Sequence, residues 1–182
     1  MSNQPRVAKV LALLMISMTA GAVVLMLLGN NPPSGGAFCL SSYYRLDSVE
    51  KALRSQIVQY QSRWSCVEVY YSDTKAGNIE QLSALAGLIS PEDLNCHFVV
   101  CNGLGGNNGQ ILSTEKWQRQ WSIIPDQTWY GNGQTIRICV IADEKTSPAT
   151  DIQRKRVDSL LQGLHRKFDI QTSCTYYPGD WN

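Results

Sequence analysis

The chain has 182 residues, with 16 Lys and Arg against 15 Asp and Glu, so its formal net charge is +1. This near-neutral balance argues against a nucleic-acid partner, because nucleic-acid binders normally carry a clustered basic surface. Charged residues make up 17% of the chain, whereas soluble domains typically have roughly 25%. Part of this deficit lies in residues 10–29, which contain no charged side chain. The part that follows, about 150 residues, is long enough for one domain with its own core.

Residues 10–29 predict one N-terminal transmembrane helix, because an apolar run of this length spans about 30 Å as a helix. A cleaved signal peptide is the alternative, but its apolar region usually measures about 7–15 residues. Arg6 and Lys9 precede the run, and the next basic residue is Arg45. The positive-inside bias therefore predicts a single-pass protein of the cytoplasmic membrane, with residues 1–9 in the cytoplasm and the C-terminal domain exported.

Two segments connect this anchor to the domain. Residues 30–46 begin with Asn, Pro, Ser and Gly, which favours a linker without regular structure. Residues 47–64 carry apolar side chains at helical spacing, from Val49 to Tyr60, and predict an amphipathic helix. Such a helix packs on its own domain or docks on a partner or a membrane surface.

The residues from 65 onward mix strand and helix patterns. Strands are predicted at 66–71, 97–101, 110–113 and 135–142, and helices at 78–89 and from Ser147 onward. The glycine-rich residues 102–109 separate two of these strands and end in Asn108-Gly109, which is a strong hairpin signal. This mixture predicts an α/β domain with a mixed central β-sheet and flanking helices.

The cysteines and a group of aromatic residues are the side chains most informative about possible binding or metal sites. Six cysteines permit up to three disulfides in an oxidising compartment. The chain has no Cys-x-x-Cys pair and only two histidines, which argues against a structural zinc site. Trp117, Trp121, Trp129 and Tyr130 are predicted to lie in a loop, where they either line a ligand groove or pin the loop to the sheet.

The order of several segments resembles one family. The segments are residues 67–72, 96–103, 109–111 and 136–141, with 146–153 at the entry to the last helix. They resemble the type 2 N-acetylmuramoyl-L-alanine amidases, which share their fold with peptidoglycan recognition proteins. The similarity covers roughly residues 64–170, and His97-Phe-Val-Val-Cys-Asn-Gly103 is its most specific part. It implies that residues 65–182 form an amidase-like domain.

The resemblance also implies a zinc cofactor, which the family holds with two histidines and a cysteine or aspartate. This chain has Tyr70-Tyr71 at the position of the first zinc histidine, and Cys96 replaces the family's tyrosine before His-Phe. Tyr177 takes the place of the last ligand. We therefore expect no zinc, no catalytic residue and no metal ligand in this chain.

Three side chains are candidate substitutes for the missing ligands. They are Asp143, Cys174 and Asp180, and none of them comes with a histidine partner in the sequence. Because hydrolytic zinc sites use three protein ligands and keep one position open for water, a single carboxylate or thiol is not enough.

These observations predict a membrane-anchored, catalytically inactive amidase-like domain that binds peptidoglycan stem peptide or an envelope protein. The predicted binding groove is bordered by residues of the former active site, namely Tyr70, Tyr71, Cys96, Trp121, Trp129, Tyr130, Tyr176 and Tyr177. Two alternatives stay open: a zinc-dependent amidase with rearranged ligands, and a structural subunit of a membrane assembly.

Overall fold

The computed structural model describes residues 8–19, 46–123 and 133–181. It divides into two compact units, residues 1–39 and 40–182. In the first unit, residues 8–19 form a helix, and the remainder of the predicted transmembrane segment lies outside the described residues, as does nearly all of the predicted linker. Among the residues that are described, no helix is both long and apolar enough to cross a membrane.

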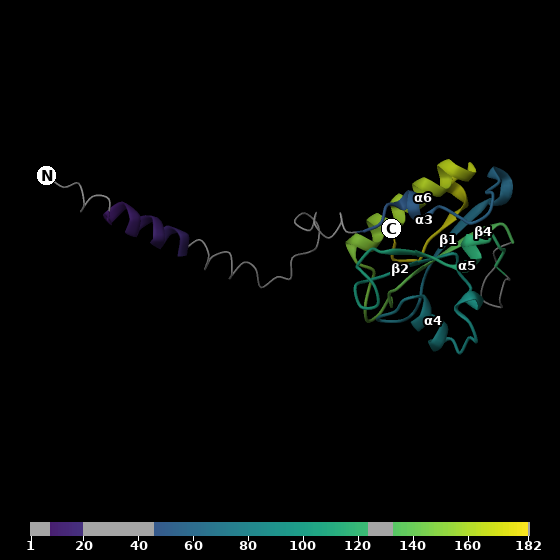
Figure 1. The fold of residues 1–182 in the computed structure, drawn as a ribbon, viewed down its shortest axis with the longest axis horizontal. Coiled ribbons are helices and arrows are strands. Elements are labelled where there is room, and N and C mark those ends of the chain that lie inside the picture. The colour runs from purple at the N-terminus through teal and green to yellow at the C-terminus, as the bar shows by residue number, and fades with distance from the viewer. Residues whose placement is uncertain (1–7, 20–45, 124–132, 182) are drawn as a thin grey trace. The chain divides into compact units, whose positions relative to one another are not determined.

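The second unit is an α/β fold built on a five-stranded mixed sheet (Figure 1). The strands are β1 (Cys66–Tyr71), β2 (Phe98–Val100), β3 (Ile111–Ser113), β4 (Thr135–Val140) and β5 (Thr175–Tyr176). Their order across the sheet is β3-β2-β4-β1-β5, and only β3 runs antiparallel to its neighbour. The predicted mixed α/β sheet with flanking helices is confirmed.

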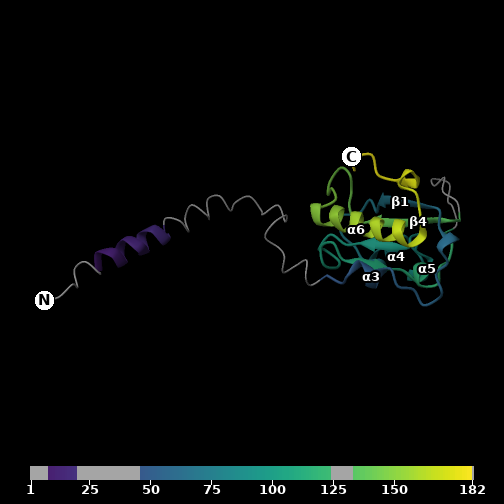
Figure 2. The same cartoon turned by 90° about the horizontal axis from the view of Figure 1, so that it is seen from above.

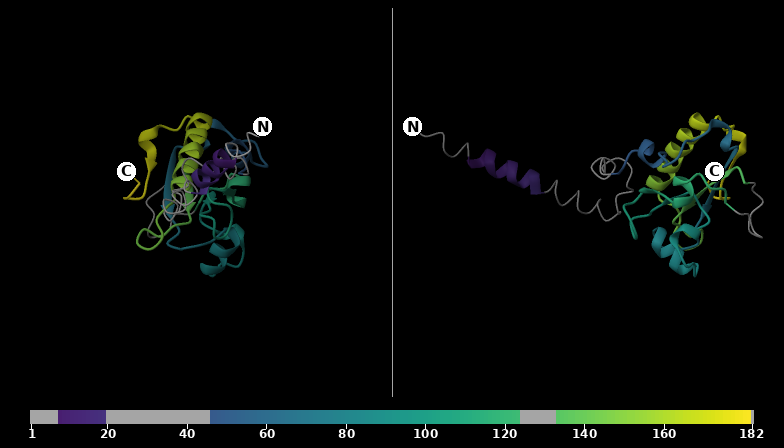
Figure 3. Two further views of the ribbon diagram at one scale, coloured as in Figure 1. Left: turned by 90° about the vertical axis from the view of Figure 1, so that its left-hand side faces the viewer. Right: turned by 45° about the vertical axis from the view of Figure 1, so that its right-hand side comes forward.

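The centre of the sheet is the pairing of β4 with β1, which lie side by side in Figures 1 and 2. All six residues of β4 are buried, as expected for a strand covered on both faces. Helix α6 (Asp151–Phe168) packs on one face, and α4 (Ile79–Leu85) packs on the other (Figure 3). Two apolar clusters result, and the cluster beneath α6 is the larger.

Helix α6 keeps its predicted buried stripe but begins later than predicted. Its apolar residues Val157, Leu160, Leu161, Leu164 and Phe168 are all buried. The start expected at Ser147 was wrong, because a capping box begins the helix three residues further on. There, the Thr150 hydroxyl accepts a hydrogen bond from the Gln153 backbone, and the Gln153 amide side chain accepts one from the Thr150 backbone.

The prediction of one amphipathic helix over residues 47–64 was wrong. The structure has a single helical turn, α3 (Val49–Ala52), and then an irregular stretch before the 3-10 helix η1 (Gln61–Arg63). Tertiary contacts satisfy the backbone where the helix stops. In particular, the Leu53 carbonyl accepts a hydrogen bond of 3.1 Å from the Lys167 ammonium group of α6. Such long-range contacts override local helical spacing.

Trp117 does not lie in a loop, contrary to the sequence prediction. It belongs to α5 (Glu115–Gln118), is fully buried, and its ring lies 4.5 Å from that of Phe98. The short helix α5 and the two-residue strand β5 were both missed, because elements this short carry no periodic signal.

The glycine-rich segment forms the β2–β3 hairpin, as predicted. Gly103 and Gly109 have φ angles of 101° and 77°, which only glycine adopts without strain. Gly105 packs against the Gly77 backbone so closely that a Cβ atom would overlap the Gly77 carbonyl group. The glycines therefore serve the tight turns and the close packing of the hairpin.

We predict that Gly105→Ala lowers the free energy of unfolding by about 1–3 kcal/mol, since the added methyl group must displace backbone. Gly179→Ala is the matched control, because no atom lies within 4 Å of the position that its methyl group would take. Urea denaturation of both variants measures the difference. Equal midpoints for the two variants would show that the hairpin is not packed in this way.

Candidate functional site

Tyr70 and Tyr71 stand where the resembled family has its first zinc histidine, and they lie on opposite faces of the sheet at the end of β1. Side chains alternate along a strand, so Tyr70 and Tyr71 point apart. Tyr70 packs with the cluster that contains Cys96 and Cys139, beneath the Arg137 guanidinium group, which lies 4.2 Å from its ring. Burial, above all, raises the pKa of the Tyr70 hydroxyl well above its ordinary value. Cys96 is thus an interior residue, and Tyr70 is half-buried against its cluster.

Tyr71 is held by the C-terminal segment, at the end of β1. Its hydroxyl donates to the Asp180 carboxylate, with distances of 2.8 and 2.9 Å to the two oxygens. Arg154 of α6 donates to the same carboxylate over 3.2 Å and also to the Asp180 carbonyl. Trp181 lies against this group, with its ring 6.0 Å from that of Tyr71 and 6.4 Å from that of Tyr177. We call these five residues the Tyr71 site.

The charges of the Tyr71 site balance each other. Burial is the largest cause of a raised pKa at the Tyr71 hydroxyl, and its bond to Asp180 adds to it, so the phenol remains a neutral donor. The Arg154 and Asp180 side chains are 29% and 30% exposed. The guanidinium group also lies 4.9 Å from the Trp181 ring. The site is therefore preorganised and still reachable from solvent.

The other predicted site residues are not gathered here. Tyr176 is exposed and aligned with Glu68 on β1, so it belongs to the opposite face from Tyr71. Trp121 is exposed, with the Arg119 guanidinium group 4.8 Å from its ring. Trp129 and Tyr130 lie outside the described residues. Among the described residues of the predicted groove, Tyr71 and Tyr177 both contact Trp181 at the Tyr71 site, whereas Tyr70 and Cys96 meet on the opposite face of the sheet.

Arg154 and Trp181 are the members of the Tyr71 site that sequence reasoning missed. Basic residues along a helix usually form a solvated face, yet Arg154 of α6 is half-buried against the C-terminal segment. The available signal was the position of Asp180 and Trp181 shortly after Tyr177, which takes the place of the resembled family's last ligand.

The residues of the Tyr71 site do not fit a zinc ion. Asp180 already accepts from a phenol and a guanidinium group, and the described residues contain no group of three His, Cys, Asp or Glu side chains that could hold a metal. Both ring nitrogens of His97 are bonded to backbone, and the His165 ring is bonded to Thr175. Coordination through either ring nitrogen of His97 would break an existing hydrogen bond, and the Nε2 atom of His165 is already bonded to the Thr175 hydroxyl.

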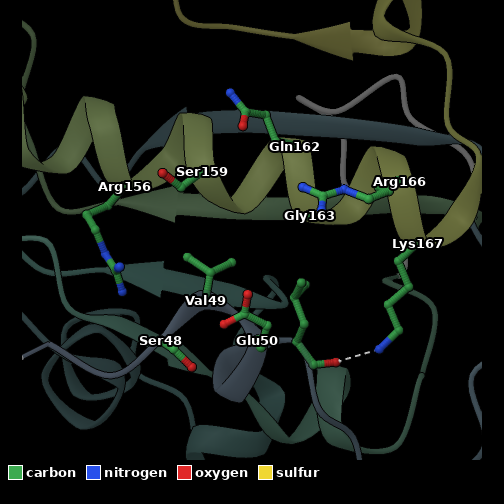
Figure 4. A pocket seen from close by; sticks show the side chains of 10 residues that line it. Ser48, Val49, Glu50, Arg156, Ser159, Gln162, Gly163, Arg166 and Lys167 are labelled. Atoms are coloured by element: carbon green, nitrogen blue, oxygen red, sulfur yellow. Dashed lines mark hydrogen bonds between the residues drawn. The ribbon is translucent and has the colours of Figure 1, made fainter.

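A separate hollow of about 610 Å³ lies between α3 and α6 (Figure 4). Figure 4 shows Arg156 and Lys167 at its two ends. Arg156 is buried and donates to the Gly109 and Asp47 carbonyls, and Lys167 donates to the Leu53 carbonyl. These cations fasten neighbouring backbone segments to α6, so the hollow is explained by packing.

Scans against protein-family models, curated proteins and solved structures find no match for this chain. Its resemblance to the amidases thus rests on the sequence segments named above.

His97 generates a prediction for the pH dependence of stability. Its Nε2 atom lies 3.0 Å from the Trp121 carbonyl oxygen, and its Nδ1 atom accepts from the Arg137 amide, so the ring is neutral. Burial is the main cause that lowers its pKa to about 3, against about 6.5 when unfolded. As pH falls below about 6.5, the unfolded state gains a proton that the folded state does not bind, so stability falls.

We therefore expect the free energy of unfolding to fall by about 2 kcal/mol through His97 between pH 7.5 and pH 5. Urea denaturation at both pH values measures this loss. His97→Gln has no titrating ring and should show a smaller pH difference, whatever its stability at neutral pH. An unchanged pH difference in that variant would contradict the assignment of the loss to His97.

Proposed function

We propose that this chain is a membrane-anchored, catalytically inactive amidase-like protein, and that its Tyr71 site binds peptidoglycan stem peptide. The anchor is the apolar run of residues 10–29, with the C-terminal domain exported. Within the mixed α/β class, we propose that the specific fold is that of the type 2 amidases.

One observation carries the proposal: the end of β1 and the C-terminal segment converge at the Tyr71 site. These are the two segments in which the resembled family has its first and last zinc ligands. Here, the Asp180 carboxylate is paired with a guanidinium group and hydrogen-bonded by a phenol in that place. In this proposal, the substrate site of the resembled enzymes keeps its position while these side chains replace the hydrolytic metal.

The exposed groups of the Tyr71 site suit a short peptide that carries carboxylates. Arg154 is partly exposed and can pair with a ligand carboxylate in a charge-assisted hydrogen bond. Tyr177 is 44% exposed and stacks on Trp181, which gives an apolar surface beside that charge. Aromatic rings next to a few fixed polar groups are typical of ligand sites.

Co-sedimentation of the purified full chain with isolated cell-wall sacculi tests the proposal. We expect binding by the unchanged chain, and affinity about tenfold weaker in Tyr177→Ala and in Arg154→Gln, the range found for residues at the centre of an interface. Tyr60→Ala is the matched control, because this exposed tyrosine precedes η1, near the opposite end of β1. It should bind like the unchanged chain.

Two results would contradict the proposal. Absence of binding by the unchanged chain would exclude peptidoglycan as the ligand. Equal losses in Tyr177→Ala and Tyr60→Ala would show that sacculi are bound by a surface other than the Tyr71 site.

A further inference from the structure

Cys66 and Cys174 meet at the edge of the sheet. β5 pairs with β1 in parallel, with Val67 aligned to Thr175 and Glu68 to Tyr176. Each cysteine directly precedes an aligned residue, so the two lie at the start of the same strand pair. Burial raises the pKa of the Cys66 thiol, and the Cys174 thiol adds to this rise.

The spacing of β1 and β5 suits a covalent bridge where the strand pair begins. Cys66 is the first residue of β1, and Cys174 is the last residue of the 3-10 helix η3 (Thr172–Cys174), directly before β5. Neighbouring strands lie about 4.8 Å apart, and a disulfide needs a Cα–Cα separation of roughly 4.4–6.8 Å. Both thiols are free and partly exposed, so a small oxidant can reach them. The other described cysteines, Cys96, Cys101 and Cys139, are buried.

We propose that Cys66 and Cys174 are a redox-active pair that forms a disulfide when the domain meets an oxidising disulfide of low molecular mass. The thiolate of one cysteine attacks this disulfide, forms a mixed disulfide and releases one small thiol. The second thiolate then attacks the protein sulfur, forms the Cys66–Cys174 bond and releases the other small thiol. In total the protein loses two protons and two electrons, and the oxidant becomes two thiols.

The bridge would fasten the segment that ends in the Tyr71 site. β5 is only two residues long, so few backbone hydrogen bonds hold the C-terminal segment to β1. Asp180 and Trp181 follow six and seven residues after Cys174. A covalent bond at Cys174 limits how far this segment can move away from the sheet. This inference goes beyond the proposed function and does not depend on what the site binds.

Peptide mapping of the full chain tests the pair directly. The folded protein is incubated with oxidised glutathione, free thiols are alkylated under denaturing conditions, and trypsin digestion is performed without reductant. Cleavage after Arg63, Lys75 and Lys167 gives peptides 64–75 and 168–182, each with one cysteine. We expect these two peptides to be joined, and their link to disappear after reduction. Burial is the main cause that raises the pKa of the Cys66 thiol, so joining should be faster at about pH 8.5 than at pH 7.

Two variants make the result specific. Cys174→Ser should leave Cys66 alkylated or bound to glutathione, whereas Cys101→Ser should still give the joined peptides. Oxidation should raise the urea midpoint of the unchanged chain and leave that of Cys174→Ser unchanged, because only a bridge restricts the unfolded chain. Recovery of both peptides alkylated, or of Cys66 joined to any other cysteine, would overturn the proposal. None of these results depends on whether the protein binds sacculi, so the two proposals can fail independently.

Discussion

The parallel pairing of β1 with β4 is the constraint on which the rest of the domain depends. Six successive residue pairs hold the two strands in register, from Cys66 with Thr135 to Tyr71 with Val140. Because β4 is buried along its whole length, a shift of one residue would turn apolar side chains of β1 away from the α6 core. This register therefore fixes which face each side chain of β1 enters. His97 supports it from the neighbouring strand by accepting the Arg137 amide proton.

The same register determines what the end of β1 can do. Tyr70 is directed into the cysteine-containing cluster beneath α4, and Tyr71 is directed toward α6 and the C-terminal segment. Only Tyr71 can therefore meet Asp180 and Arg154. In our account, this hydrogen-bonded trio stands where the resembled enzymes bind zinc. A carboxylate that is neutralised by a guanidinium group and hydrogen-bonded by a phenol no longer requires a metal ion for its charge.

Local patterns predicted the parts of the fold that burial makes periodic. The stripe of α6 and the alternation in β1 follow from one face or side being apolar, and both were confirmed. The helix over 47–64 failed because contacts with α6 and α5 decide that segment, and these are invisible to spacing. Trp117 was misplaced for the same reason.

The candidate site was harder to predict than the fold. Tyr71 and Asp180 are separated by 109 positions, and no local pattern shows that their side chains meet. Tyr70 and Tyr71 are adjacent in the sequence, which suggested a shared role. Side chains alternate along a strand, however, so the two point to opposite faces of the sheet. The resemblance placed the C-terminal segment at the position of the family's last zinc ligand. It therefore indicated Tyr177 and Asp180 as candidate residues, but it did not indicate their contacts.

In our account, the side chains of the Tyr71 site satisfy one another without a metal ion. Calorimetric titration of the chelator-treated full chain with zinc, beside the Asp180→Asn variant, tests it most directly. Our account predicts no site filled at micromolar zinc, or weak binding by exposed thiols that is equal in both proteins. One zinc ion bound tightly per chain and lost in Asp180→Asn would contradict it.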